Sequence, residues 1–394
     1  MKILHVSIFP EKGLKHAEAG GVSSYTRNLI SNLPTSDGDT VYIVCNKIND
    51  KNEYYEEEGV MVHRCFNKDF RFIFQILKEI KRIKPDVVHL QHELNLYGNP
   101  ITAYLFQWLV FFLRDYKTIT TIHGVVSIKS IDKIFVKENS STVPVFLVKL
   151  AFFIFYAPIC FFSKKVIVHE EVFRKILIEE YWVSSSKIEV VPHGIEDLKT
   201  ISTMDARKYL NLPLEKKIVL FMGYLTGYKG IDLLIDGFSK YIIEDPDVLL
   251  IIGAGVHPKN KFNKNYMDVY NSMKEKAEKL LVDKHTWVGF IAEDSIKYYF
   301  SASDLSIYPY TYHLASSGPM SISIGYEKPF LASDVFDNLI EDKNMLFKKN
   351  PQDMVVALKK FFLNKDLYEE QIKKLKESSL WGTNGKKLYD IYTN

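Results

Sequence analysis

The chain has 394 residues, which is enough for two or three domains, each with its own core. Hydrophobic residues make up 47% and charged residues 25%, which excludes a largely disordered chain. Lysine plus arginine is 51 and aspartate plus glutamate is 48, so the formal net charge of +3 gives no support for nucleic-acid binding. Three cysteines, none in a zinc or Cys-x-x-Cys spacing, predict a reducing compartment, and the strand-like first residues MKILHVS do not resemble a secretory signal.

Short β-branched runs alternate with helical patterns along the first half, which predicts βαβ units around a parallel sheet. The predicted strands are residues 2–7, 40–46, 59–65, 86–92, 117–124, 164–169 and 188–194. The predicted helices are residues 23–33, 70–82, 101–113, 143–162 and 171–180.

The alternation restarts in the second half. The predicted strands are residues 216–224, 247–255, 285–290, 304–310 and 328–334, with helices near 230–243, 264–280, 294–301, 319–326 and 351–363. A Gly and two Pro without strand character between Pro192 and Leu214 predict a domain boundary there. We therefore expect an α/β protein with two doubly wound domains, 1–196 and 197–380, followed by a final helix in 381–394. Ligands are expected in a cleft at the carboxyl ends of the two sheets.

Two stretches of the first half are strongly apolar and aromatic, residues 101–113 and 143–162. The second is long enough to span a membrane, but Lys149 lies inside it and Pro158 near its end. Three interpretations stay open at this point: a membrane span, a buried helix, or a helix lying in the membrane interface with Lys164 and Lys165 behind it.

Two glycine-rich segments follow predicted strands and precede helices. Gly20-Gly21 opens the first long helix, and paired glycines at a helix start allow close approach of an anion to backbone N–H groups. The segment 223–230 places Lys229 between a strand and a helix, where its charge can balance a diphosphate. Taken alone, a glycine pair at a helix start is more often an ordinary turn. For Lys229, an ordinary solvated lysine beside a turn glycine is an equal alternative.

Two further motifs lie after strand 304–310 and at the end of strand 117–124. Ser316-Ser317-Gly318-Pro319-Met320 has the composition of a capped helix start, which leaves N–H groups free for phosphate oxygens. His123 follows a strand whose carboxyl end faces the expected cleft, where an imidazole can bind a phosphate or a sugar hydroxyl. A structural cap and an incidental histidine are the alternatives.

In order and spacing these segments resemble the glycosyltransferase family 4 group, which has the GT-B fold of two facing Rossmann-like domains. The resemblance covers nearly the whole chain. It rests on the Gly-Gly helix start, TIHG (121–124), VIVHEE (166–171), IEVVPHGIE (188–196), GYLTGYKGIDLLIDGF (223–238), LLIIGAG (249–255), VGFI (288–291), ASDLSIYPY (302–310), SSGPMSISIGYEKPFLASD (316–334) and Leu380-Trp381.

The resemblance implies a retaining hexosyltransferase that moves a sugar from a nucleotide sugar, a UDP- or GDP-sugar, to an acceptor held by the N-terminal domain. No further cofactor and no metal are expected. The C-terminal domain would hold the nucleotide, and the last helix would cross back to the first domain. The resemblance further implies that His123 and Lys229 act in catalysis and that His92 and Glu93 face the acceptor. The implied donor-binding residues are Gly20, Gly21, Gly223, Tyr224, Gly289, Phe290, Ile291, Ser316, Ser317, Gly318, Pro319 and Met320.

The chain departs from the family pattern at three positions. Tyr224 stands where the family commonly has an arginine, and Leu314 and Ile322 fall on the slots of two glutamates. We interpret this as a subtype, with a catalytically degenerate binding subunit and a nucleotide-sugar isomerase or hydrolase as alternatives. The aromatic helices motivate the hypothesis of a lipid-linked or cell-envelope glycan acceptor, and of a cytoplasmic enzyme of polysaccharide biosynthesis at the inner face of the membrane.

Overall fold

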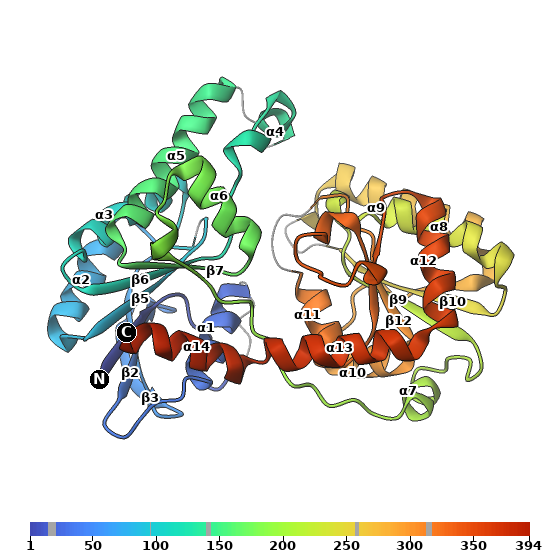
Figure 1. Ribbon diagram of the computed structural model, residues 1–394, viewed down its shortest axis with the longest axis horizontal. Helices are drawn as coiled ribbons and strands as arrows, with labels where there is room; N and C mark the ends of the chain where they lie inside the picture. Colours follow the sequence, from blue (N-terminus) through green and yellow to red (C-terminus); the bar gives the residue numbers. More distant parts are fainter. Residues whose placement is uncertain (15–20, 95, 139–142, 257–259, 313–316) are drawn as a thin grey trace. The chain divides into compact units, whose positions relative to one another are not determined.

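The chain divides into two compact units. The computed structural model describes residues 1–14, 21–94, 96–138, 143–256, 260–312 and 317–394. Unit 1 comprises Met1–Gly194 together with Trp381–Asn394, and unit 2 comprises Ile195–Leu380. Each unit has a mostly parallel sheet with helices on both faces (Figure 1), so the predicted fold class of two doubly wound α/β domains is confirmed.

The sheet of unit 1 has eight strands. In spatial order they are β3 (Glu53–Glu57), β4 (Val60–Phe66), β2 (Thr40–Asn46), β1 (Lys2–Val6), β5 (Val87–His92), β6 (Lys117–Ile122), β7 (Lys165–Val168) and β8 (Ile188–Val190). All neighbours pair in parallel except β3, which is antiparallel to β4. Strand β3 was not predicted from the sequence, because its segment EYYEE is an exposed edge strand with no buried apolar face.

Helices cover the two faces of this sheet unequally. One face carries α2 (Phe72–Ile83), α3 (Pro100–Phe112), α5 (Val145–Phe162) and α6 (Glu171–Tyr181), and the other carries α1 (Gly21–Ser31) and α14 (Trp381–Thr393); the short α4 (Lys133–Glu138) contacts α5. Successive strand residues point to opposite faces, so Ile3 and Val87 pack against α1 and α14, whereas Leu4 and Val88 pack on the other side. This alternation decides where the histidines described below lie.

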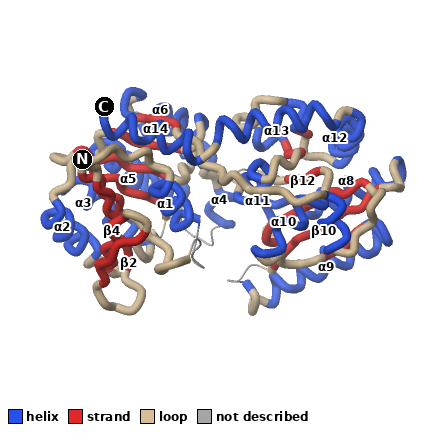
Figure 2. The backbone as a smooth tube through the Cα atoms, turned by 90° about the horizontal axis from the view of Figure 1, so that it is seen from below, coloured by secondary structure: helices blue, strands red, loops and turns tan. Residues whose placement is uncertain are grey.

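Helix α14 is held closely against α1 (Figure 1). A Cβ at Gly385 of α14 would lie 2.0 Å from the carbonyl oxygen of Asn32, so only glycine permits this approach. Asp39 accepts hydrogen bonds from the N-terminal amine of Met1 at 2.8 Å and from the Tyr389 hydroxyl of α14 at 2.5 Å. Both chain ends therefore lie on the same side of unit 1 (Figure 2).

The sheet of unit 2 has six parallel strands. In spatial order they are β11 (His285–Trp287), β10 (Val248–Gly255), β9 (Lys217–Tyr224), β12 (Leu305–Tyr308), β13 (Phe330–Ser333) and β14 (Leu346–Phe347). The helices are α7 (Thr203–Tyr209), α8 (Ile231–Glu244), α9 (Lys264–Leu281), α10 (Glu293–Ala302), α11 (Gly318–Gly325), α12 (Pro351–Leu363) and α13 (Lys365–Ser379). The largest core packs α8, α9 and α12 on one face, and a smaller core packs α10 on the other.

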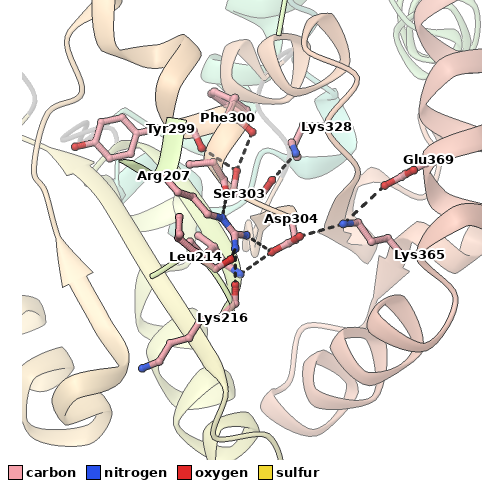
Figure 3. Close-up of polar contacts among 12 residues, drawn as sticks. Arg207, Leu214, Lys216, Tyr299, Phe300, Ser303, Asp304, Lys328, Lys365 and Glu369 are labelled. Atoms are coloured by element: carbon pink, nitrogen blue, oxygen red, sulfur yellow. Dashed lines mark hydrogen bonds and ion pairs between the residues drawn. The ribbon is translucent and has the colours of Figure 1, made fainter. Parts of the chain in front are cut away.

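A polar cluster ties two helices of unit 2 to the amino end of its strands (Figure 3). Asp304, just before β12, accepts hydrogen bonds from the Ile218 N–H at 2.8 Å, from Arg207 of α7 at 2.8 Å and from Lys365 of α13 at 3.0 Å. Although burial acts to raise the pKa of Asp304, the backbone N–H and the two cations hold it below its ordinary value. The cluster lies at the strand ends opposite to those that carry ligands in such sheets, so we assign it to stability.

Candidate functional site

Lys229 is a buried cation at the carboxyl end of β9. It ends the short turn Gly227–Lys229 that leads into α8, and its side chain is only 7% exposed. Its ammonium donates a hydrogen bond to the Tyr310 hydroxyl and lies 4.0 Å from the centre of the Tyr310 ring and 5.0 Å from that of Tyr228. Burial lowers the pKa of Lys229 to about 8. Within the described part of the chain no carboxylate forms an ion pair with it, so its charge is available to an anionic ligand.

Gly230 fixes the direction in which the chain leaves Lys229. Its φ of 66° lies in the left-handed region, and a Cβ at this position would lie 1.8 Å from the carbonyl oxygen of Pro309. The turn therefore packs directly on the segment that carries Tyr310. We expect a side chain at this position to displace Lys229 from Tyr310.

Tyr310 connects this cation to the start of α11. Its hydroxyl lies 2.7 Å from the Ser317 hydroxyl, and the Ser317 oxygen in turn accepts from the Met320 N–H at 3.4 Å as the N-cap of the helix. A helix N-terminus favours a negative charge. Lys229 and the first turn of α11 thus belong to one hydrogen-bonded group. Tyr310 was not predicted as a site residue, although it is the last residue of a predicted strand.

The other predicted residues of the 316–320 motif contribute less through their side chains. Ser316 lies outside the described residues, and so does Leu314. The Met320 side chain is in the core, Pro319 has no N–H to donate, and the Pro319 carbonyl accepts from the Tyr308 hydroxyl at 2.8 Å. Gly318 is exposed at the first position of the helix. A ligand at the first turn of α11 would therefore be bound mainly by backbone groups and not by these side chains.

Residues 223–224, at the end of β9, lie beside residues 289–291, which follow β11. The rings of Tyr224 and Phe290 are nearly parallel, with an angle of 14° and centres 5.9 Å apart. Gly223 is in an extended conformation with positive φ beside the Lys229 side chain. Ile291 is a core residue against Gly253, so its side chain does not face a ligand. Tyr224, which replaces the expected arginine, therefore forms an aromatic surface with Phe290.

In unit 1, α1 begins at Gly21, which is exposed, and Gly20 lies outside the described residues. His123 follows β6 and is half-buried. The Tyr25 ring of α1 meets the His123 ring edge-on, with centres 4.7 Å apart. Both ring nitrogens of His123 are engaged, Nε2 at 2.8 Å from the Gln91 side chain and Nδ1 at 3.2 Å from Nε2 of His169. A ligand contact through the ring must therefore replace one of these hydrogen bonds.

His92 does not lie beside His123. Strand alternation turns Gln91 and His92 to opposite faces of the sheet, and the His92 ring packs between Phe106 and Phe155 at 4.8 Å from each. Only 2% of His92 is exposed, so contact with an acceptor requires movement of α3 or α5. Glu93, one residue further on, is exposed. The two residues predicted as acceptor contacts thus have different surroundings.

Sequence models of two glycosyltransferase families match the two halves of the chain. "Glycosyltransferase Family 4" matches residues 19–197 and "Glycosyl transferases group 1" matches residues 203–378. Mannosylfructose-phosphate synthase of Agrobacterium fabrum is 26% identical over 214 residues, 49% of this chain and 44% of that protein. D-inositol 3-phosphate glycosyltransferase of Corynebacterium aurimucosum is 41% identical over 76 residues, 18% of each chain. The matches thus span less than half of these relatives.

Solved structures resemble the whole chain. Sucrose-phosphate synthase from Thermosynechococcus elongatus has a TM-score of 0.72 at 18% identity and covers 100% of this chain and 98% of its own. HepE from Anabaena in complex with UDP has a TM-score of 0.69 at 13% identity, with 100% of both chains covered. At these identities the likeness shows the fold, which is GT-B. The two family matches together span nearly the whole chain, and they show that it is a glycosyltransferase enzyme with a "Glycosyltransferase Family 4" N-terminal half and a "Glycosyl transferases group 1" C-terminal half.

Proposed function

We propose that the protein transfers a sugar from a nucleoside diphosphate sugar to an acceptor, with retention of anomeric configuration. The observation that carries this proposal is the buried Lys229 ammonium, linked through Tyr310 to the first turn of α11. A cation and a helix N-terminus held together in this way suit a diphosphate. The HepE structures with UDP and with UDP-glucose are consistent with a uridine donor, and a guanosine donor is the alternative.

The chemical step needs stabilisation of the departing nucleoside diphosphate. Lys229 and the N–H groups of α11 supply fixed positive charge for this purpose, which is electrostatic preorganisation. The described residues of the site contain no carboxylate that we can assign as a covalent nucleophile, so we propose attack by the acceptor on the face from which the diphosphate leaves. Trapping of a covalent glycosyl-enzyme, or an inverted product anomer by NMR, would contradict this mechanism.

Metal-independent transfer is part of the proposal. The sequence has two Asp-x-Asp motifs, 37–39 and 245–247, which precede the amino ends of β2 and β10. Asp39 accepts hydrogen bonds from the Met1 amine at 2.8 Å and the Tyr389 hydroxyl at 2.5 Å. Asp245 accepts them from Lys217 at 2.6 Å and from the Tyr241 hydroxyl at 3.0 Å. This arrangement supports a structural role for Asp245. Activity measured with and without excess EDTA is therefore expected to be the same.

A panel of UDP-, GDP- and ADP-sugars tests the proposed function. The expected result is release of free nucleoside diphosphate from one of them, and thermal stabilisation of the protein by the same donor. A ligand at 100 times its Kd adds about 2.7 kcal/mol to the free energy of unfolding. If no donor stabilises the protein, the alternative of a binding subunit without a donor site is favoured. Donor hydrolysis or isomerisation without any acceptor would favour the other alternative.

Donor affinity is expected to fall as the pH rises above about 8. Since the pKa of Lys229 is lowered to about 8, the free protein loses this charge as the pH passes that value. A bound diphosphate stabilises the ammonium and raises its pKa, so binding takes up a proton and affinity declines by up to about tenfold per pH unit. Calorimetry at pH 7 and pH 9, in buffers of different ionisation enthalpy, measures both effects. Equal affinity at the two values, without proton uptake, would contradict a role for Lys229.

We further propose that unit 1 contacts a membrane surface through α3 and α5, as expected for a lipid-linked acceptor. Helix α5 has the length and mean hydropathy (2.3) of a span, yet only 22% of its residues are buried. Its second half packs in the core through residues such as Phe155 and Ile159, whereas its first half has no fully buried residue and exposes Phe146, Leu147 and Leu150. The exposed apolar side chains of the two helices are Ile101, Trp108, Phe112, Phe146, Leu147, Leu150, Ile154 and Phe161. An interfacial helix fits this division better than a buried helix or a span.

The variant with Phe146→Glu and Leu150→Glu tests the membrane contact. Both side chains are exposed and one helical turn apart, so the change removes apolar area and adds negative charge without touching the core. We expect its sedimentation with anionic vesicles at low salt to fall at least about tenfold relative to the unaltered protein. Phe262→Glu in unit 2, where Phe262 is 94% exposed, is the matched control and should sediment normally. If the unaltered protein stays in the supernatant, the membrane proposal is wrong.

A further inference from the structure

Four histidines of unit 1 contact the rings of Tyr25 in α1 or Tyr392 in α14: His5 in β1, His89 in β5, His123 directly after β6 and His169 directly after β7. Hydrogen bonds join three of them into one chain through Gln91. The steps are Tyr392 Oη to His89 Nδ1 (2.5 Å), His89 Nε2 to Gln91 Nε2 (3.3 Å), Gln91 Oε1 to His123 Nε2 (2.8 Å), His123 Nδ1 to His169 Nε2 (3.2 Å), and His169 Nδ1 to the Val191 carbonyl oxygen (3.0 Å).

The Val191 end of the chain fixes the positions of the protons. A carbonyl oxygen only accepts hydrogen bonds, so Nδ1 of His169 must carry a proton. A neutral imidazole carries only one, which leaves Nε2 of His169 as an acceptor. Nδ1 of His123 must therefore donate to it, and Nε2 of a neutral His123 is then an acceptor as well. Gln91 has to offer its N–H group to this nitrogen, which half a turn of its carboxamide allows.

The alternative arrangement keeps the Gln91 oxygen against Nε2 of His123. It needs a third proton on the His123–His169 pair, so that one of the two rings carries two protons, and hence a positive charge in the core. Burial opposes that charge: it lowers the pKa of His169 to about 3, and burial with the neighbouring histidines lowers the pKa of His123 well below its ordinary value. Tyr25, a neutral aromatic side chain, contacts both rings, at nearly a right angle to that of His123 and tilted against that of His169. The neutral, directional arrangement is therefore the stable one.

We propose that His169 is a positioning residue that holds His123 in the Nδ1–H tautomer and so makes Nε2 of His123 a hydrogen-bond acceptor at the carboxyl end of β6. This inference rests on the proposed function in one respect, the contact of His123 with the donor. An acceptor nitrogen takes a hydrogen bond from a sugar hydroxyl, in exchange for the Gln91 amide. It has no proton to give to a phosphate oxygen. The tautomer thus assigns His123 to the sugar of the donor.

Nitrogen NMR of protein labelled with 15N-histidine tests the tautomer without any substrate. His123 is assigned by the loss of its signals in His123→Gln. We expect a pyrrole-type Nδ1 and a pyridine-type Nε2 at neutral pH, and the same pattern in His169→Gln, whose carboxamide oxygen can still accept from His123. In His169→Leu, which offers no acceptor, the proton should move to Nε2. An imidazolium or an Nε2–H form in the unaltered protein would overturn the proposal, and so would an unchanged tautomer in His169→Leu.

Kinetics with the donor identified by the panel provide the second readout. His169→Leu should lower kcat/KM by about tenfold or more, the size expected when a buried hydrogen-bonding group loses its partner, and His169→Gln should retain most of it. His5→Leu is the matched control, because His5 lies in the same core against His89 but neither of its ring nitrogens has a hydrogen-bond partner among the described residues. An equal loss of kcat/KM in His5→Leu and His169→Leu would show that His169 acts only through packing. If no donor is turned over at all, the proposed function fails while the tautomer result stands.

Discussion

Replacing Lys229 with alanine is expected to lower turnover by about 100-fold or more. The ammonium is the one described cation that the structure places against Tyr310 and the start of α11, so its loss removes a charge-assisted hydrogen bond to the departing diphosphate. The measurement is the rate of nucleoside diphosphate release at saturating donor. Lys229→Met, which keeps most of the volume without the charge, should show the same loss.

Stability separates this catalytic loss from misfolding. Because burial lowers the pKa of Lys229 to about 8, the lysine is charged at pH 7 and the folded protein then bears the full cost of burying the ammonium. Lys229→Met, which removes this cost, should unfold no more readily than the unaltered protein at pH 7. Lys276→Ala is the control for charge alone, since Lys276 is bound to Asp232 and Asp236 on the surface of unit 2. An unchanged rate of nucleoside diphosphate release in Lys229→Ala would show that Lys229 is not part of the site.

Asp304→Asn is expected to lower the free energy of unfolding of unit 2 by about 3 kcal/mol. The change removes the carboxylate charge that Arg207 and Lys365 share, and it leaves the Arg207 guanidinium, which is 5% exposed, without its ion-pair partner. This expected loss of stability is at the lower end of the range for breaking a buried ion pair, because the Asp304 side chain is 18% exposed. Hydrogen exchange of peptides from β9 and β12 reads the stability of unit 2 separately from that of unit 1.

An exposed ion pair of the same unit provides the comparison. Asp337 and Lys343 lie 2.9 Å apart with side chains that are both about three-fifths exposed, so Asp337→Asn should cost less than about 1 kcal/mol. The pKa of Asp304 is lower in the folded protein than its ordinary value, so its stabilising contribution is present at neutral pH and is lost as the pH falls through the folded value. Equal protection of β9 and β12 in both variants would contradict the structural role of the cluster.

Periodicity predicted most of the fold because both sheets are buried on two faces and their strands are continuous apolar runs. Besides the short elements α4, α7 and β14, it missed β3, whose residues are mostly charged or exposed, and α13, whose buried stripe consists of Tyr368, Ile372 and Lys376 in an otherwise polar helix. Both β3 and α13 are stabilised by packing against neighbours more than by their own composition, which single-segment patterns do not reveal.

The site was only partly predictable for a related reason. Glycine and lysine positions follow from strand ends and turn chemistry, so the sequence pointed to Lys229 and the start of α11. The contact between Lys229 and Tyr310 joins residues 81 positions apart and depends on strand order. The strand containing Gln91 and His92 was predicted, but both faces of its sheet are covered, so alternation alone could not tell which of the two residues accompanies His123.

The missing glutamate slots also have a physical explanation where the structure describes them. Ile322 is partly buried and packs against the smaller core of unit 2, which contains Tyr326 and Phe300, so its apolar side chain contributes to that core. Tyr224, in place of the arginine, lies against Phe290. Among the described residues of the site, Lys229 therefore supplies the positive side-chain charge.

Calorimetric titration with a nucleoside diphosphate and with the corresponding nucleoside tests this account most directly. We predict that the unaltered protein binds the diphosphate at least about 100-fold more tightly than the nucleoside, and that Lys229→Met removes most of that difference. If the two ligands bind equally well, or if the variant binds the diphosphate as tightly as the unaltered protein, Lys229 and α11 do not hold a pyrophosphate and the assignment of the donor site is wrong.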